Sequence, residues 1–173
     1  NILITVKQAT IKFSIKNLLD KEKYDFKKMQ LSNFEINLNI KSLKKYKNIF
    51  SKKINFFPTT FTKGRIIFFD EKNYVATIND VNLDLEFMQE SINTILKGKF
   101  LGDDIYINLD VKKVDKKVLT NIILKLSKMN FLTKVNFVNS EKNQDIMDGN
   151  FMAKKGKNRI TGVFDYKDNE LII

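Results

Sequence analysis

The side chains of this sequence that could perform chemistry are carboxylates, hydroxyls and lysine amines, because the chain contains no Cys and no His. The lack of His removes the commonest general base and the commonest neutral metal ligand. Carboxylate pairs remain at Asp103-Asp104 and at Asp80 with Asp84. Paired carboxylates can hold a divalent ion or carry out acid–base catalysis, so these pairs are the first candidates for a reactive site.

Both carboxylate pairs stand in contexts that favour a structural role. Asp103-Asp104 directly follows Gly102, at a turn signal where Asp is preferred for its backbone geometry. Asp80 and Asp84 flank the solvent side of an alternating apolar segment. The sequence also has no Gly-rich phosphate loop and no Gly-x-Ser-x-Gly motif. We therefore expect that the protein is not an enzyme and uses no cofactor and no metal ion.

The excess of Lys gives a formal net charge of +11 and favours an anionic partner, either nucleic acid or anionic lipid. An AT-rich genome would produce the same excess of Lys, Asn, Ile and Phe without a functional cause. Arg, which nucleic-acid readers prefer, occurs only at Arg65 and Arg159. Lys pairs, from Lys27-Lys28 to Lys154-Lys155, are spread along the chain, and the Phe residues mostly fall in phase with the aliphatic residues. A nucleic-acid-binding or protein-adaptor domain with a fully packed core is therefore the alternative function.

The elements that position these side chains are predicted to be β-strands. Apolar and polar residues alternate in the segments 10–16, 34–40, 78–87 and 105–111. Because successive side chains of a strand point to opposite faces, each segment has one apolar and one polar side. This pattern is typical of an antiparallel sheet covered on one face. Turn signals that predict hairpins lie at 70–73, 102–104 and 154–158.

Helical spacing of apolar residues predicts two helices, over 41–50 and 114–129, with Ser42 and Asp115 as their N-caps. A shorter helix is predicted near 88–96, although its end also fits a strand. Both longer segments carry only residues that are typical of core packing, so their expected role is to cover part of the sheet.

The expected fold class is α+β and mostly β, with one long curved antiparallel sheet and about two helices packed on it in a single domain, 1–173. Two helices cover too little of a sheet with this many strands. The remaining apolar surface requires a second sheet, closure of the sheet on itself, or an apolar ligand. From the residues alone, a lipid groove and a packed core remain equal alternatives. The chain begins at Asn1 rather than at a Met, so we expect a fragment of a longer protein. It has no apolar stretch of the ~18 residues that span a membrane.

Several short motifs occur in an order found in a known family. In the segment 63–87, Gly64 opens a strand, Asp70 marks an acidic turn, and the strand 79-NDVNLDL-85 follows. Alternating strands over 29–40 and a short helix precede it. This arrangement resembles the AsmA-like family of bacterial envelope proteins. The family's Leu-x-Gly-x-Phe hairpin and C-terminal strands are similar to the segments 96–111, 149–153 and 162–166.

The resemblance implies a sheet curled into a taco-shaped or partial-barrel groove, in a periplasmic protein tethered to the inner membrane. It implies a lipid-handling module in phospholipid transport or outer-membrane assembly, with phospholipid or another acyl-chain lipid as partner and envelope proteins as possible further partners. The family's membrane anchor would lie outside this sequence. The implied mechanism is passive, with acyl chains on the apolar face and headgroups near the Lys residues. The groove candidates are Phe34, Ile36, Leu38, Val81, Leu83, Leu85, Ile105, Ile107 and Leu109.

Overall fold

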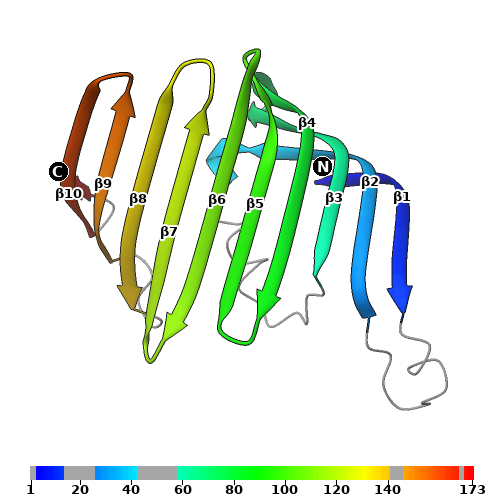
Figure 1. Cartoon of the computed structure of the whole chain (residues 1–173), viewed down its shortest axis with the longest axis horizontal. Coiled ribbons are helices and arrows are strands. Elements are labelled where there is room, and N and C mark those ends of the chain that lie inside the picture. The colour runs from blue at the N-terminus through cyan, green and yellow to red at the C-terminus, as the bar shows by residue number, and fades with distance from the viewer. Residues whose placement is uncertain (1–2, 14–25, 43–57, 141–145, 168–169) are drawn as a thin grey trace. The chain divides into compact units, whose positions relative to one another are not determined.

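The structure is a computed structural model that describes residues 3–13, 26–42, 58–140, 146–167 and 170–173 (Figure 1). The first strands are β1 (Ile4–Phe13), β2 (Phe26–Asn39), β3 (Thr59–Asp70), β4 (Asn73–Met88) and β5 (Ser91–Phe100), and the 3₁₀ turn η1 (Ile40–Ser42) follows β2. The later strands are β6 (Asp103–Val114), β7 (Lys117–Leu126), β8 (Phe131–Ser140), β9 (Met147–Lys155), β10 (Asn158–Lys167) and β11 (Glu170–Ile172).

All eleven strands belong to one sheet, in which their spatial order is their order along the chain. The pairs are antiparallel wherever the register is resolved, except that β2 and β3 run parallel. The chain divides into two compact units. Unit 1 comprises residues 1–84 and 98–102, and unit 2 comprises residues 85–97 and 103–173.

The prediction of an α+β fold with two helices is wrong, because the described part of the chain is almost entirely β. The segment 114–129 forms the strand β7 rather than a helix. Its residues Val118, Ile122 and Leu126 have helical spacing, but strand alternation places them on one face equally well. Asp115, expected as a helix cap, lies instead in the β6–β7 turn with a φ of 56°. Pairing of β7 with strands on both sides decides between the two patterns.

The other helical segments also differ from expectation. The shorter helix near 88–96 is replaced by a turn and the strand β5. Of the predicted helix 41–50, only Lys41 and Ser42 lie within the described residues, where they belong to η1, and the rest lies outside them. The hairpin turns predicted at 70–73 and 154–158 are confirmed as the β3–β4 and β9–β10 connections.

In unit 1 the inward face changes by one residue at the same level in the paired strands β2 and β3. Asn33 of β2, Lys63 of β3 and Asp80 of β4 all have positive φ values, of 53°, 56° and 51°. The pairing of β2 with β3 is interrupted at this level, between the pairs Ser32–Thr62 and Glu35–Arg65, and it resumes in the same register. Such bulges shift the alternation, so that the buried residues change from odd to even positions within one strand.

The core of unit 1 lies at the level of these bulges. Phe34 is 3% exposed and its ring meets that of Phe61 edge-to-face, with centroids 5.1 Å apart. The Phe34 ring also lies on Gly64, where a Cβ atom would overlap it. Val81, which follows the bulge in β4, is fully buried. The main apolar contacts of unit 1 therefore lie where the strand faces change over.

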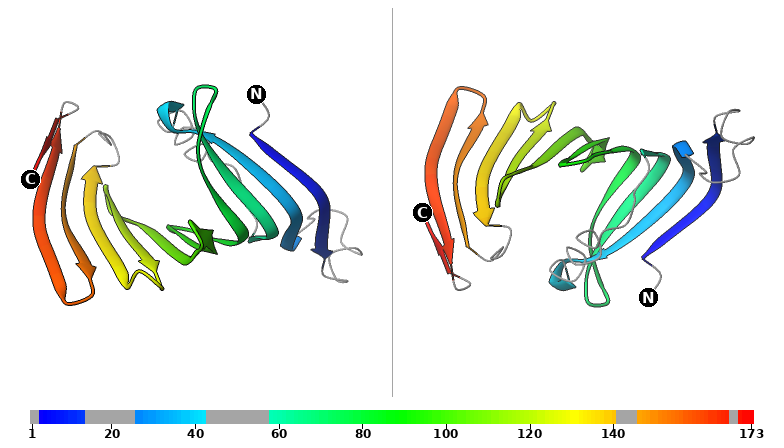
Figure 2. Two further views of the ribbon diagram at one scale, coloured as in Figure 1. Left: turned by 90° about the horizontal axis from the view of Figure 1, so that it is seen from above. Right: turned by 90° about the horizontal axis from the view of Figure 1, so that it is seen from below.

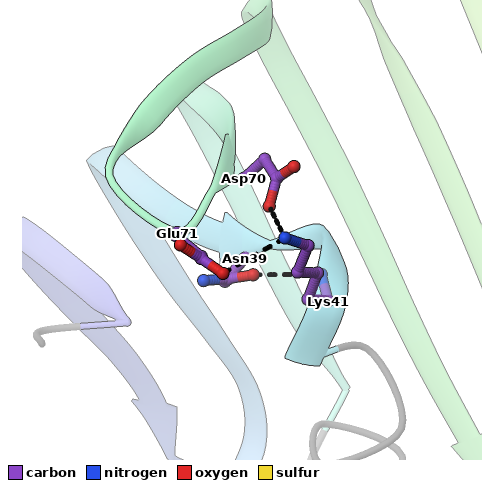
Figure 3. A network of polar contacts seen from close by, with 4 residues as sticks. All are labelled: Asn39, Lys41, Asp70 and Glu71. Carbon is purple, nitrogen blue, oxygen red and sulfur yellow. Dashed lines mark hydrogen bonds and ion pairs between the residues drawn. The ribbon is translucent and has the colours of Figure 1, made fainter.

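A polar network fixes the far end of β2 to the β3–β4 turn (Figure 3). Lys41 Nζ lies 3.0 Å from Asp70 Oδ1 and 3.1 Å from Glu71 Oε1. The Lys41 backbone N–H donates to Asn39 Oδ1 at 3.0 Å. The carboxylates of Asp70 and Glu71 raise the pKa of Lys41. These contacts are solvent-exposed, so they position the turn rather than stabilise the unit greatly.

The core of unit 1 yields a stability prediction. Phe34→Ala removes the contact with Phe61 and uncovers Gly64, so we expect it to lower the free energy of unfolding by about 3–5 kcal/mol. Urea denaturation followed by circular dichroism measures the change. Val75→Ala, at a side chain that is 49% exposed in the same unit, is the control and should change it by less than about 0.5 kcal/mol. Equal effects of the two substitutions would show that Phe34 is not a core residue.

Candidate functional site

Unit 2 has one apolar sheet face, built by strands β6 to β10, which lie side by side in Figure 1. Directly opposed residues of antiparallel strands point to the same face, so the register assigns every side chain to one side. Three successive cross-strand rows form this apolar face: Ile107, Leu124, Thr133, Ala153 and Ile160; then Leu109, Ile122, Val135, Phe151 and Gly162; then Val111, Thr120, Phe137, Gly149 and Phe164. At one end the next row consists of Ile105, Leu126, Phe131 and Lys155.

The apolar face is only partly covered. Ile105 and Thr120 are buried, at 6% and 8% exposure, but Leu109, Ile122 and Leu124 remain partly exposed. Within the described residues no helix or second sheet is available to cover this face, since the strands of unit 2 all belong to the one sheet. A contiguous exposed apolar surface of this extent is typical of a binding surface.

Two Phe–Gly pairs shape the apolar face. Phe164 lies across Gly149 and Phe151 lies across Gly162, and each ring belongs to the residue directly opposite the glycine. A Cβ atom at Gly162 would lie 2.6 Å from the Phe151 ring, so a larger residue would displace it. The rings therefore pack along the sheet over β9 and β10 and compensate for the missing side chains. Figure 2 shows these two strands adjacent in both of its views.

The opposite face of the same strands is mixed and richer in polar residues, although it also carries Leu119 and Ile123. Asp110, Asn121, Asn136 and Asn150 form one of its cross-strand rows. Asn136 Nδ2 donates to Asn150 Oδ1 at 3.0 Å, and Lys112 Nζ lies 3.2 Å from Asp110 Oδ2. A hollow of ≈ 250 Å³ lies over this row. Unit 2 thus separates an apolar face from an amide- and charge-rich face.

Asp103 supports the turn at one end of these strands. It is 4% exposed, and its carboxylate oxygens accept hydrogen bonds from the backbone N–H groups of Lys128 at 2.7 Å and Met129 at 2.9 Å. Burial opposes ionisation of Asp103, but the N–H donors of Lys128, Met129 and Asp104 outweigh it and lower the pKa. The structural role expected for Asp103 thus has a concrete form, the fixing of the β7–β8 turn.

The nine residues proposed from the sequence as groove candidates lie in both units. In unit 1, Phe34, Ile36 and Val81 are buried within the core, whereas Leu38 and Leu83 are partly exposed. In unit 2, Leu85, Ile107 and Leu109 are partly exposed and Ile105 is buried. The register brings Ile105, Ile107 and Leu109 onto the apolar face.

Sequence reasoning missed the part of the apolar face that β7 to β10 contribute. Alternation in 131–137, where Phe131, Thr133, Val135 and Phe137 share one side, would have identified β8. The residues of β7 were hidden by the helical interpretation of 114–129.

Comparisons with known proteins assign no family. No protein-family model or curated protein matches the sequence, and no solved structure matches the fold. In the described part of the chain, no helix has the length and apolar character to cross a membrane, and no three or more carboxylates are grouped so that they could hold a metal ion. The resemblance to the AsmA-like family therefore rests on its short motifs.

The contacts of Asp103 predict a pH-dependent loss of stability. Because the folded-state pKa is lowered, the stabilisation is present above the unfolded-state pKa of about 3.9 and is lost as the pH falls through the lower folded-state value. Asp103→Asn should destabilise the protein at neutral pH, since an amide oxygen cannot replace both carboxylate oxygens as acceptors. Thermal unfolding at a series of pH values should show the two proteins converging in acid. A difference that is the same at neutral and acidic pH would contradict this role of the carboxylate.

Proposed function

We propose that this protein binds lipid acyl chains along the apolar face of unit 2. The observation that carries the proposal is the continuous cross-strand register of apolar side chains over β6 to β10, opposite a polar face. Each methylene group moved from water onto such a surface gains about 0.8 kcal/mol. Binding of this kind requires no reactive group, which fits the lack of His and Cys.

The size of the apolar face suits an acyl chain. Neighbouring strands lie about 4.8 Å apart, so the strands β6 to β10 span roughly 19 Å across the sheet. One leaflet of a bilayer has a hydrocarbon thickness of roughly 15 Å, half of the ~30 Å core, which approximates the length of one acyl chain. A chain lying across the strands would contact one row of side chains along its whole length.

The ends of the apolar face suit a charged headgroup. Lys155 ends one row beside Phe131, and Lys113 continues the face beyond Val111 at the other end. A phosphate group placed there would meet a Lys amine while its acyl chain lay on the apolar rows. The motifs similar to the AsmA-like family favour the same substrate class, and within this proposal the chain is a phospholipid-handling module of the bacterial periplasm that serves lipid transport or outer-membrane assembly.

The proposal predicts different effects of neighbouring substitutions in β7. Leu124→Asn places an amide on the apolar face, so we expect affinity for a fluorescent fatty acid to fall about tenfold, which corresponds to about 1.4 kcal/mol. Ile123→Asn is the matched control, because Ile123 lies on the opposite face of the same strand and its replacement should leave affinity nearly unchanged.

Native mass spectrometry of the purified chain, followed by organic extraction, identifies any lipid that co-purifies. Stoichiometric phospholipid that Leu124→Asn removes and Ile123→Asn retains would support the proposal. A lipid-free mass together with no uptake of added fatty acid would refute it and leave the apolar face to a protein partner.

A further inference from the structure

A cluster of cations lies at one end of the unit 2 strands. This basic rim consists of Lys128, Lys154, Lys155, Lys157 and Arg159, all of them exposed. Its residues come from the β7–β8 turn and the β9–β10 hairpin, and the Gly156 N–H donates to the Asn130 carbonyl oxygen at 3.1 Å. Residues far apart in the sequence are therefore held at the same end of the strands, with Lys154 and Arg159 on the polar side of the sheet and Lys155 on the apolar side.

The basic rim contains a repulsive pair. Lys154 and Arg159 are directly opposed in the β9–β10 register, and like charges in that position destabilise a sheet. Among the described residues, neither side chain has a carboxylate within ion-pair distance, and the same holds for Lys155 and Lys157. An anion bound between these cations would relieve the repulsion.

The opposite end of the strands is also rich in Lys but is partly neutralised. There the β6–β7 turn and the strand ends that flank it carry Lys112, Lys113, Lys116 and Lys117. Lys112 pairs with Asp110, and Asp115 lies within the turn itself. Among the described residues, Lys154, Lys155, Lys157 and Arg159 of the basic rim therefore lack such an ion pair, whereas Lys128 lies near the Asp103 carboxylate.

An exposed apolar residue, Met129, lies beside Lys128 in the β7–β8 turn. Met129 is 49% exposed, and its backbone N–H is held by Asp103. The rim also adjoins the apolar face, because Lys155 stands opposite Phe131 in the terminal row of that face. Lys residues around an exposed apolar side chain are typical of surfaces that enter the headgroup region of a membrane.

We propose that the basic rim docks on a bilayer surface that bears anionic phosphate headgroups, with Met129 entering the interface. Proteins that bind single-stranded nucleic acid typically offer aromatic side chains on which bases stack, and the rim offers Met129 instead. Docking goes beyond the proposed binding of acyl chains and does not require it, because the rim contacts headgroups of an intact bilayer. It would nevertheless present one end of the apolar face to the membrane.

Vesicle binding by the whole chain tests the rim with variants of equal charge. The rim variant Lys155→Glu/Lys157→Glu/Arg159→Glu and the control Lys72→Glu/Lys116→Glu/Lys117→Glu, at exposed lysines outside the rim, lower the net charge equally. On phosphatidylcholine vesicles with one quarter phosphatidylglycerol, we expect the rim variant to bind at least about tenfold more weakly than the control. Equal losses of vesicle binding in both variants would refute the role of the rim, because net charge alone would then explain the binding. If the unmodified chain did not bind the vesicles, membrane docking would be refuted.

A single-tryptophan comparison tests the insertion of Met129, since the chain contains no Trp. Met129→Trp should show a blue-shifted emission on the same anionic vesicles and no shift on pure phosphatidylcholine. Val114→Trp, at an equally exposed position in the opposite turn, should show no shift on either. A shift for Val114→Trp and none for Met129→Trp would overturn the proposal.

Competition separates a membrane from other anions. Inorganic phosphate and a single-stranded oligonucleotide, each in excess over accessible lipid, should leave the rim-dependent vesicle binding intact. Displacement by phosphate would assign the rim to small anions, and displacement by the oligonucleotide would assign it to nucleic acid. Either displacement refutes membrane docking without bearing on fatty-acid uptake by the apolar face.

Discussion

Strand register is the constraint on which unit 2 depends. In a sheet, a shift of one residue moves every side chain of a strand to the other face. In β7 such a shift would replace Ile122 and Leu124 on the apolar face with Ile123 and Lys125. The face therefore exists only while β7 keeps its pairing with Leu109 and Ile107 on one side and with Val135 and Thr133 on the other. Turn geometry and cross-strand contacts must fix that pairing, because the described part of unit 2 has no second layer to do so.

Two kinds of contact are suited to fixing the register. At the strand ends, Asp103 binds the amides of the β7–β8 turn, and the Asn130 carbonyl accepts the Gly156 N–H. Within the sheet, the Phe164–Gly149 and Phe151–Gly162 pairs fit only when ring and glycine stand opposite each other. A slipped register would place a side chain under each ring, so these pairs oppose misalignment as well as stabilising the native form.

Much of the sheet could be predicted from the sequence, since alternation in 34–40, 78–87 and 105–111 identified parts of β2, β4 and β6. The turns at 70–73 and 154–158 could be predicted because they carry residues with strong turn preferences. The strand β7 could not, because it has apolar residues on both faces: Leu119 and Ile123 lie opposite to the apolar face and complete a helical stripe with Val118 and Ile122.

Features that depend on the pairing of different strands could not be predicted from single segments of the sequence. The bulges at Asn33 and Lys63 interrupt the alternation of their strands, and their alignment appears only once β2 and β3 are paired. The candidate apolar face was only partly foreseen, through Ile105, Ile107 and Leu109, for the same reason. Local patterns give each strand an apolar side, but cross-strand pairing decides which sides combine.

Charge and apolar surface are arranged differently in unit 2, and the difference bears on function. Apolar residues gather on one face, while the cations of the basic rim gather at the strand ends, where Lys154 and Arg159 repel each other. Stability alone would favour a carboxylate in one of these positions, as Asp110 provides for Lys112 on the polar face. Within its described residues, unit 2 thus keeps an open apolar face and, at the strand ends, four cations without ion pairs, namely Lys154, Lys155, Lys157 and Arg159. In the two proposals lipids supply both complements, an acyl chain for the face and the anionic headgroups of a bilayer for the rim, and this shared chemistry connects them.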